Sequence, residues 1–142
     1  MARVREIVRG RPLYSVDKSN TVAQVARRMA ELKVGAIVVL SGPELCGLFS
    51  ERDLMTRVVA RGLDPASTPV SEVMSTELST VDESAALEEA LERMHTAGCR
   101  HLPVMREGRV TGFLSMRDLM NYELARKTEE LKHMRAYIQE ST

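Results

Sequence analysis

The chain contains the same segment twice, and this repeat limits the folds that it can adopt. Residues 16–55 align without a gap with residues 81–120, and twelve of the forty pairs are identical. The correspondence is strongest between 47–55 and 112–120, which share the pattern Gly-x-x-Ser-x-Arg-Asp-Leu-Met. A unit of this length is too small to bury its own apolar face, so we expect the copies to pack on each other. Two like halves across a pseudo-twofold axis create paired clefts between them.

The first part of each copy predicts a strand followed by a helix. Residues 13–16 and 78–81 are typical of short strands, and the apolar residues that follow recur every three or four positions, as on a helix packed against a core. The expected helix N-caps are Ser19 and Ser84. The expected helix ends are at Gly35 and Gly98.

The second part of each copy predicts two strands and a helix. The buried strands are expected at 36–40 and 102–105, with hairpin turns at 41–44 and 106–109. The second strands of the hairpins follow at 45–49 and 110–114, and helices begin near 50 and 115. The repeat is therefore β-α-β-β-α, and we expect an α/β (α+β) fold of two such repeats with a long C-terminal helix.

A short lead-in precedes each copy, because 4–7 matches 70–73 at an offset of 66 rather than 65. The first copy therefore has one extra residue after its lead-in. We expect the chain to be divided into repeat 1 with a lead-in helix, a linker, repeat 2 and a helical extension, at 1–62, 63–69, 70–126 and 127–142 respectively.

The last helix is predicted to run from Arg117 to about Gln139, beyond the repeat to which it belongs. Its apolar residues lie near heptad spacing, interrupted by Lys127: Met120, Leu124, Leu131, Met134 and Ile138. Such a stripe is a packing face, either on its own chain or on a partner subunit. We favour a homodimer contact, and a different protein partner for this helix is the other possibility.

Net charge, apolar runs and cysteine spacing limit the kinds of partner and the cellular compartment that we expect for this protein. The net charge is zero, which argues against a nucleic-acid partner, although residues 1–71 carry +4 and residues 72–142 carry −4. This asymmetry fits solvated helix faces, and it also fits a head-to-tail dimer. The chain lacks an apolar run long enough for a membrane span and a signal-peptide pattern. Cys46 and Cys99 have no metal-like spacing, so we expect buried structural thiols in a cytoplasmic protein.

The motif Gly-x-x-Ser-x-Arg-Asp has two interpretations. Ser50 with Asp53, and Ser115 with Asp118, have the spacing of a helix capping box, in which each side chain bonds a free backbone N–H. The same geometry suits a ligand, because a helix N-terminus attracts phosphate and a carboxylate can accept hydrogen bonds from both hydroxyls of a ribose. Spacing alone favours the capping box.

Residues 4–120 resemble a tandem pair of CBS domains, also called a Bateman module. The resemblance rests on the two Gly-x-x-Ser-x-x-Asp turns, on Arg100-His101-Leu102-Pro103-Val104, and on the two in-register copies. The chain is also similar to standalone bacterial CBS-pair proteins, which have a long C-terminal helix and no attached enzyme. The resemblance implies adenosine ligands between the repeats, with the Ser of the turn on phosphate, its Asp on ribose, and the apolar-Pro-Val strand on adenine.

The resemblance implies a set of ligand-binding residues in each repeat. The second repeat supplies Ser115, Asp118, Arg100, His101, Leu102, Pro103, Arg117 and Thr80. The first repeat supplies Ser50, Asp53, Arg52, Ile37 and Val38. Because the first repeat has Gly35-Ala36 where the second has Arg100-His101, it lacks two basic side chains that could bind phosphate. We therefore predict a polyphosphate site at Asp118, and at Asp53 a site that is weak, empty or adapted to a less charged ligand.

The remaining residues do not assemble into a metal cluster or a nucleophile with its base, so we do not expect an enzyme or a required cofactor. The resulting hypothesis is a regulatory module that binds AMP, ADP, ATP or a ligand similar to NAD or S-adenosylmethionine, and transmits this binding to a partner. The alternative is a ligand-independent protein-interaction or dimerisation module, in which Ser-x-x-Asp only caps helices.

Overall fold

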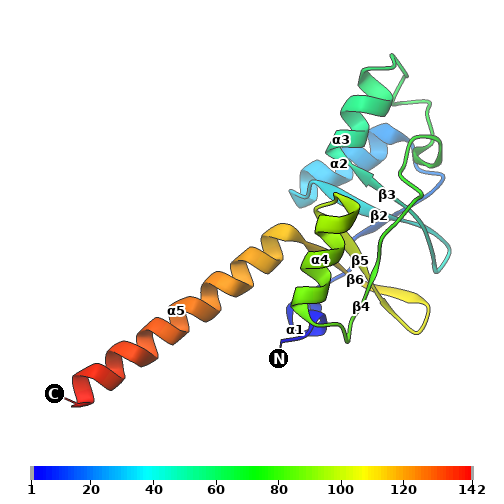
Figure 1. The fold of residues 1–142 in the computed structure, drawn as a ribbon. Helices are drawn as coiled ribbons and strands as arrows, with labels where there is room; N and C mark the ends of the chain where they lie inside the picture. The colour runs from blue at the N-terminus through cyan, green and yellow to red at the C-terminus, as the bar shows by residue number, and fades with distance from the viewer. Residues whose placement is uncertain (1, 142) are drawn as a thin grey trace.

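The computed structural model describes residues 2–141, which form two similar α/β halves and a long helix that projects from them (Figure 1). Each half has the order β-α-β-β-α, as predicted. The first half consists of β1 Ser15–Asp17, α2 Val22–Leu32, β2 Ala36–Ser41, β3 Glu44–Ser50, the short helix α3 Glu51–Asp53 and the π-helical turn η1 Leu54–Val59. The second half consists of β4 Val81–Asp82, α4 Leu87–Ala97, β5 His101–Arg106, β6 Arg109–Ser115 and α5 Met116–Ser141.

The two halves have the same sheet, down to its local irregularities. In each sheet the first strand pairs parallel with the second, and the second pairs antiparallel with the third. The register shifts at Val39/Leu40 in one hairpin and at Val104/Met105 in the other. At both shifts a side chain bonds the strand: Cys46 Sγ donates to the Val39 carbonyl at 3.4 Å, and Thr111 Oγ1 donates to the Val104 carbonyl at 3.4 Å. The Cys46 thiol therefore has a structural contact.

The expected N-caps at Ser19 and Ser84 are wrong. The amide and hydroxyl of each serine donate hydrogen bonds to the carboxylate two residues earlier, Asp17 or Asp82. Hydrogen bonds from the serine hydroxyl and amide hold the pKa of each of these two carboxyls below its ordinary value. The serines thus close a tight turn after the strand, and the helices begin later, with Thr21 as the N-cap of α2.

The two α-helices also end differently. Helix α4 ends at Gly98, as predicted, with the left-handed φ of 66° that glycine adopts without strain. Helix α2 ends earlier than expected, at Lys33 rather than Gly35, and Lys33 itself has the left-handed φ of 58°. This end of α2 places the Lys33 side chain on the lining of the cleft between the halves.

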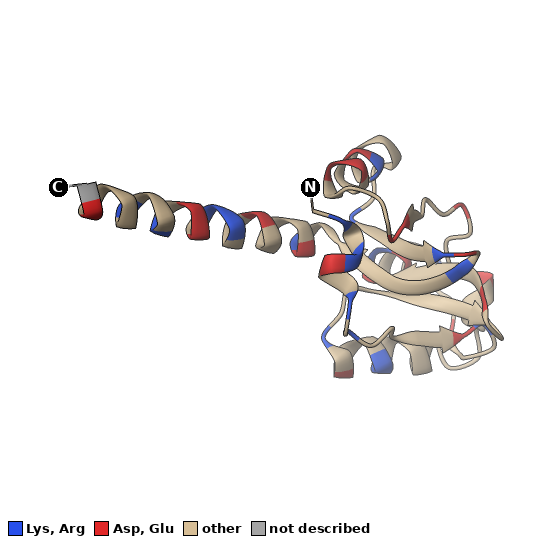
Figure 2. Ribbon diagram, turned by 90° about the horizontal axis from the view of Figure 1, so that it is seen from below, with Lys and Arg blue, Asp and Glu red and all other residues tan. Residues whose placement is uncertain are grey.

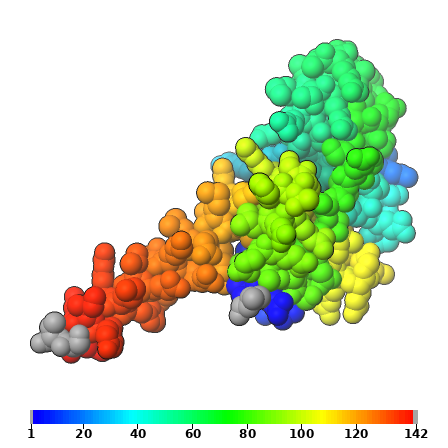
Figure 3. Space-filling view, viewed as in Figure 1, coloured from blue at the N-terminus to red at the C-terminus, as the bar shows by residue number. Residues whose placement is uncertain are grey.

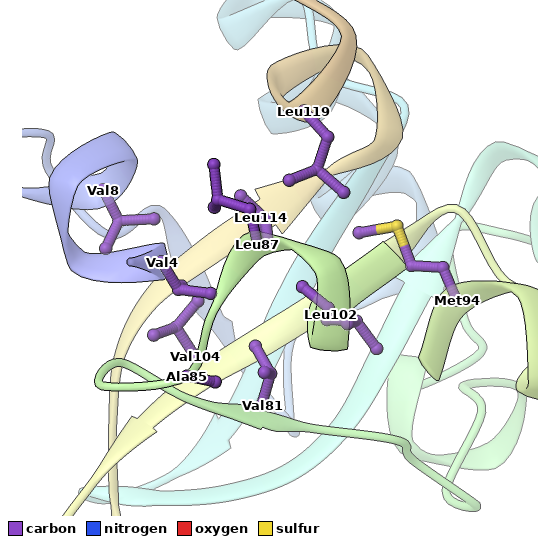
Figure 4. Close-up of a cluster of buried hydrophobic side chains, with 11 residues drawn as sticks. Val4, Val8, Val81, Ala85, Leu87, Met94, Leu102, Val104, Leu114 and Leu119 are labelled. Atoms are coloured by element: carbon purple, nitrogen blue, oxygen red, sulfur yellow. The ribbon is translucent and has the colours of Figure 1, made fainter. Parts of the chain in front are cut away.

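Each lead-in packs on the half that it does not precede. Helix α1 (Val4–Val8) lies against the second half, where Val4 and Val8 point toward side chains of β5 and β6 (Figure 4). The 3-10 turn η2 (Val70–Glu72) leads into the second repeat, yet Val70 and Val73 are buried in the core of the first. The backbone bonds match: Val4 N–H donates to Ala85 O at 2.9 Å, and Val70 N–H donates to Asn20 O at 2.8 Å. The halves are therefore interlocked.

Helix α5 is attached to the second half at its N-terminal end and then leaves the body of the molecule (Figure 3). Leu119 is buried in the core of this half, and Tyr122 donates a hydrogen bond to Glu6 of α1 at 3.3 Å. All residues from 124 to 140 are exposed. Among the described residues, we find no helix with the length and apolarity needed to cross a membrane.

Replacing Val4 with alanine tests the exchanged packing of the lead-in. Val4 is fully buried in the core of the second half. Removal of two methyl groups there should lower the free energy of unfolding by about 2 kcal/mol, through lost burial and the cavity left behind. Urea unfolding measures this change. The control is Arg5→Ala at the neighbouring exposed position, which should shift stability by less than about 0.5 kcal/mol. Equal effects of the two substitutions would contradict the packing.

Candidate functional site

A cleft of about 1160 Å³ lies between the two halves. The first half contributes the end of α2, the start of β2 and Glu51. The second half contributes the start of β5, the end of β6 and the first turns of α5, and the loop after α1 closes one side. Its polar and charged lining side chains include Arg11, Tyr14, Lys33, Glu51, Arg100, His101, Ser115, Arg117, Asp118 and Asn121. This volume lies slightly above the roughly 300–1,000 Å³ of typical small-molecule pockets, so a nucleotide-sized molecule can be accommodated.

Ser115 and Asp118 form a capping box at the start of α5. The Ser115 amide donates to Asp118 Oδ2 at 2.8 Å, and the Asp118 amide donates to Ser115 Oγ at 3.1 Å. The structural interpretation of the motif is therefore correct. The capping box does not exclude a ligand contact, because the Asp118 side chain is 22% exposed and its Oδ1 takes no part in the cap.

Arg11 bonds both oxygens of the Asp118 carboxylate. Its two terminal nitrogens donate to Oδ1 at 3.0 Å and to Oδ2 at 3.2 Å, a bidentate arrangement. Arg11 also donates to the Phe113 carbonyl at 3.0 Å. Sequence reasoning missed Arg11, because the pair joins residues far apart in the chain. The sequence does mark the segment that contains Arg11, because the first copy has one extra residue between its lead-in and its repeat.

The pKa of Asp118 reflects opposing effects. Burial by itself raises the pKa, but the hydrogen bonds from Arg11 and Ser115, with the charge of Arg11, outweigh burial. The net result is a pKa below the ordinary value, so Asp118 is ionised at neutral pH. An ionised carboxylate accepts hydrogen bonds on both oxygens and donates none.

His101 is an aromatic residue that lines the cleft. Burial lowers the pKa of its imidazole, and the nearby negative charges of Asp118 and Glu51 only partly oppose that effect. The ring stacks on Phe113, with 5.3 Å between ring centroids and 4° between planes. The resemblance implies that His101 and Arg100 lie near phosphate, and this stays a prediction. In the structure the imidazole forms one half of an aromatic pair with Phe113.

The charges that line the cleft favour an anion. Four cations face two carboxylates: Arg11, Lys33, Arg100 and Arg117 against Glu51 and Asp118. The cations come from the loop after α1 and from both halves, so a ligand that engages several of them bridges the halves. Glu51 lies where the missing side chain of Gly35 leaves space, 3.3 Å from the position of an added Cβ.

The matching turn of the first half is closed. Asp53 is 6% exposed, and its carboxylate accepts hydrogen bonds from the Ser50 amide at 3.0 Å and the Ser75 hydroxyl at 3.3 Å, with Arg57 Nε at 3.7 Å. Ser75 is held there by two backbone hydrogen bonds with Leu48, at 2.9 and 3.0 Å. The segment after η2 therefore lies across this turn and covers the carboxylate.

The cleft brings together five of the residues predicted for the site: Arg100, His101, Ser115, Arg117 and Asp118. Other predicted residues lie elsewhere. Leu102 and Ile37 are buried in the two cores, and the Thr80 carbonyl accepts a hydrogen bond from Arg93 at 2.8 Å. Residues of that group outside the cleft lining are Leu102, Pro103, Thr80, Ser50, Asp53, Arg52, Ile37 and Val38. Ligand binding by either group stays a prediction.

Two segments of the chain match the CBS domain family, residues 4–60 and 70–125. A relative from Methanopyrus kandleri, the uncharacterized protein MK0525, is 30% identical over 133 residues. This match covers 90% of the chain and 65% of MK0525, so the chain spans just under two thirds of that relative's length.

Solved structures share the fold. A signal-transduction protein with CBS domains from Burkholderia ambifaria, itself described as putative in that role, has a TM-score of 0.82 at 30% identity, covering 87% of this chain and 95% of its own. The CBS domain protein PAE2072 from Pyrobaculum aerophilum, complexed with AMP, has a TM-score of 0.75 at 30% identity, covering 82% of this chain and 89% of its own. These matches indicate a regulatory rather than a catalytic family.

Replacing Arg11 with glutamine tests the ion pair. The pKa of Asp118 should rise toward the ordinary aspartate value of about 3.9, because the guanidinium that favours the ionised form is gone. An NMR titration of the Asp118 carboxyl carbon measures this. Arg117→Gln is the matched control, since Arg117 lines the same cleft and is not among the described residues that bond Asp118. A rise of equal size in both variants would contradict the assignment.

The Arg11→Gln variant should also change how the free energy of unfolding depends on pH. Because the folded pKa of Asp118 is depressed, its ionisation stabilises the fold above the unfolded pKa of about 4, and this contribution is lost as pH falls through the lower folded pKa. Arg11→Gln should therefore lower the free energy of unfolding at pH 7 and have less effect at pH 2–3. The difference should not exceed about 1 kcal/mol, because Arg11 is 42% exposed.

Proposed function

The chain belongs to the CBS-domain family, and on this basis we propose that it is a regulatory module that binds an adenosine nucleotide in the cleft beside Asp118. The observation that carries the proposal is the composition of that cleft: an accessible ionised carboxylate and a helix N-terminus lie among four cations. The AMP complex of the similar protein PAE2072 supports an adenosine ligand.

We derive the binding mode from the present partners of Asp118. The two ribose hydroxyls would donate to its carboxylate oxygens, in place of the two Arg11 N–H groups. The released guanidinium would then bind phosphate, which sits favourably at the N-terminus of α5. One charge-assisted interaction replaces another, so the exchange does not leave a buried charge unpaired. Arg100 and Lys33 supply further charge for a ligand with more than one phosphate.

The base is proposed to lie near the aromatic pair of His101 and Phe113, which offers flat apolar faces for stacking. At the first half, we propose that Asp53 does not hold a nucleotide in this conformation. Its carboxylate is already bonded by Ser50 and Ser75, and the segment carrying Ser75 would have to move to admit a ribose. This proposal keeps the weak or empty site among the alternatives predicted for the first repeat, and a site adapted to a less charged ligand would require that movement.

The signal is proposed to leave the cleft through α5. Met120 and Asn121 of this helix line the cleft, and the loop that carries Arg11 joins α1, so the ligand would contact elements of both halves and the projecting helix at once. Regulation requires that a partner distinguish the bound from the free state. We propose a cytoplasmic homodimer without catalytic activity of its own, in which the ligand acts as signal rather than as substrate.

Asp118→Asn tests the proposed function. Calorimetry and thermal shift with AMP, ADP, ATP, NAD, NADH and S-adenosylmethionine should identify at least one ligand that raises the melting temperature, by mass action. The substitution removes a charged acceptor from the ribose, so affinity for that ligand should fall about 10-fold to 100-fold. Asp53→Asn is the matched control from the other repeat, and it should leave the affinity within about threefold. Melting curves without ligand show whether each variant is folded.

A protein that binds none of these ligands at millimolar concentration would overturn the proposal. The ligand-independent interaction module would then be favoured, with Ser115 and Asp118 serving only as a helix cap. In that case Asp118→Ala should lose about 1 kcal/mol of stability and nothing else. Equal loss of affinity in Asp118→Asn and Asp53→Asn would instead place the ligand elsewhere or in both turns.

A further inference from the structure

Lys33 occupies a backbone position that favours glycine. It has a φ of 58° and a ψ of 44°, which lie in the left-handed region. Its counterpart in the aligned second repeat is Gly98, with a φ of 66° and a ψ of 32°. In this region the Cβ of any residue other than glycine lies close to a backbone carbonyl oxygen, which lowers the stability of the fold. The first half therefore has a side chain at a position where glycine would be more stable.

The fold imposes this conformation in both halves, because α2 and α4 end with the same hydrogen bond. After α2, the Val34 N–H donates to the Met29 carbonyl at 3.1 Å. After α4, the Cys99 N–H donates to the Met94 carbonyl at 3.0 Å. The chain must turn left-handed between helix and strand to form either bond. The destabilisation at position 33 thus follows from the choice of lysine and not from an irregular backbone.

Packing does not account for the lysine. Its side chain is exposed and belongs to neither core. Among residues 2–141, the Lys33 ammonium has no hydrogen-bond or ion-pair partner. The side chain instead lines the cleft between the halves, at the end of α2. A strained residue with an unpaired charge on the wall of a cleft indicates a role in binding rather than in folding.

Lys33 gives the first half a cation at the cleft, although this half lacks the arginine of the second. The counterpart of Arg100 is Gly35, and a Cβ at position 35 would lie 3.3 Å from Glu51 Oε1. The first half supplies its cation two residues earlier, so Lys33 and Arg100 come to the cleft from different halves. Along α5, by contrast, basic and acidic residues are interspersed (Figure 2).

We propose that Lys33 binds the outer phosphates of a nucleotide, so that the cleft favours nucleoside di- and triphosphates over monophosphates. This inference rests on the proposed function, in which the ribose lies on Asp118 and the first phosphate lies at the N-terminus of α5. Both of these contacts belong to the second half, whereas Lys33 belongs to the first. A longer phosphate chain extends across the cleft, where the flexible stem of a lysine lets its ammonium follow a phosphate as a point charge.

The proposal predicts that Lys33 lowers stability and raises affinity, and two substitutions separate these effects in the full chain. Lys33→Gly relieves the backbone and should raise the melting temperature without ligand by about 2–4 °C. Lys33→Met keeps a long side chain on the same backbone and should leave the melting temperature within about 1 °C. In both variants calorimetry should show about 5-fold to 20-fold weaker binding of ATP, with AMP affinity within about twofold.

Glu107→Gly is the matched control. Glu107 is the other residue besides glycine that has a positive φ among the described residues, at 49°. It lies in the turn between β5 and β6, outside the cleft lining, and its counterpart in the first half is Gly42, with a φ of 59°. Glycine should raise the melting temperature here as well. The affinities for ATP and AMP should both stay within about twofold of the wild-type values.

Two results with nucleotides would overturn the proposal. Unchanged ATP affinity in both Lys33 variants would show that the lysine does not bind the ligand. Equal loss of ATP and AMP affinity would place Lys33 at the first phosphate or at the nucleoside, and the cleft would then not select by the length of the phosphate chain.

Sodium tripolyphosphate distinguishes this proposal from the proposed function. It carries a phosphate chain without a nucleoside, and it should raise the melting temperature of the wild-type protein more than that of Lys33→Met. If the wild-type protein binds no nucleotide, the proposed function fails, and this comparison alone decides whether Lys33 binds a phosphate chain. Equal shifts in the two proteins would overturn the role of Lys33.

Discussion

The reciprocal packing of the lead-in segments is the constraint on which the rest of the molecule depends. Helix α1 completes the core of the second half, and Val70 with Val73 completes the core of the first. Neither core is closed without a segment from the far side of the linker, so the halves cannot separate without exposing apolar surface. The lead-ins also run on to the two Ser-x-x-Asp turns. Arg11 follows α1 to Asp118, and Ser75 follows η2 to Asp53.

The two carboxylates differ because the lead-ins differ. Asp53 and Asp118 each belong to a capping box of the same type, and each accepts a hydrogen bond from the serine amide of its own turn. At Asp53 the approaching segment forms a single bridge with β3, between Ser75 and Leu48, and brings the Ser75 hydroxyl to the carboxylate, which is only 6% exposed. At Asp118 the approaching loop brings the guanidinium of Arg11, which lines the cleft and bonds both carboxylate oxygens, and Asp118 stays 22% exposed. The pseudo-twofold symmetry is thus broken at the positions where a ligand would be bound.

The repeated β-α-β-β-α order could be predicted from sequence because it depends on the local spacing of apolar residues and on turn residues. Both signals occur in each of the two copies. The exceptions are informative. Ser19 and Ser84 are of a residue type that commonly caps helix N-termini. Their hydroxyls instead bond the aspartate two residues earlier and are not used to cap the helix. Lys33 ends α2 in the left-handed conformation, for which glycine was expected, and Gly35 was therefore predicted as the helix end. Arg11 could not be predicted as a partner of Asp118, because that pair depends on the docking of α1 across the whole fold.

Helix capping and the proposed ligand binding can share the Asp118 carboxylate, because an ionised carboxylate accepts several hydrogen bonds on its two oxygens. The cap uses Oδ2 and the Ser115 amide, which fix the N-terminus of α5. Arg11, in the loop after α1, bonds Oδ1 and also Oδ2, and Tyr122 of α5 donates a hydrogen bond to Glu6 of α1. A ligand that replaced Arg11 would leave the cap intact and release the loop after α1. The first structural consequence of binding would therefore fall on the contact between α1 and α5, where the lead-in, the cleft and the projecting helix meet.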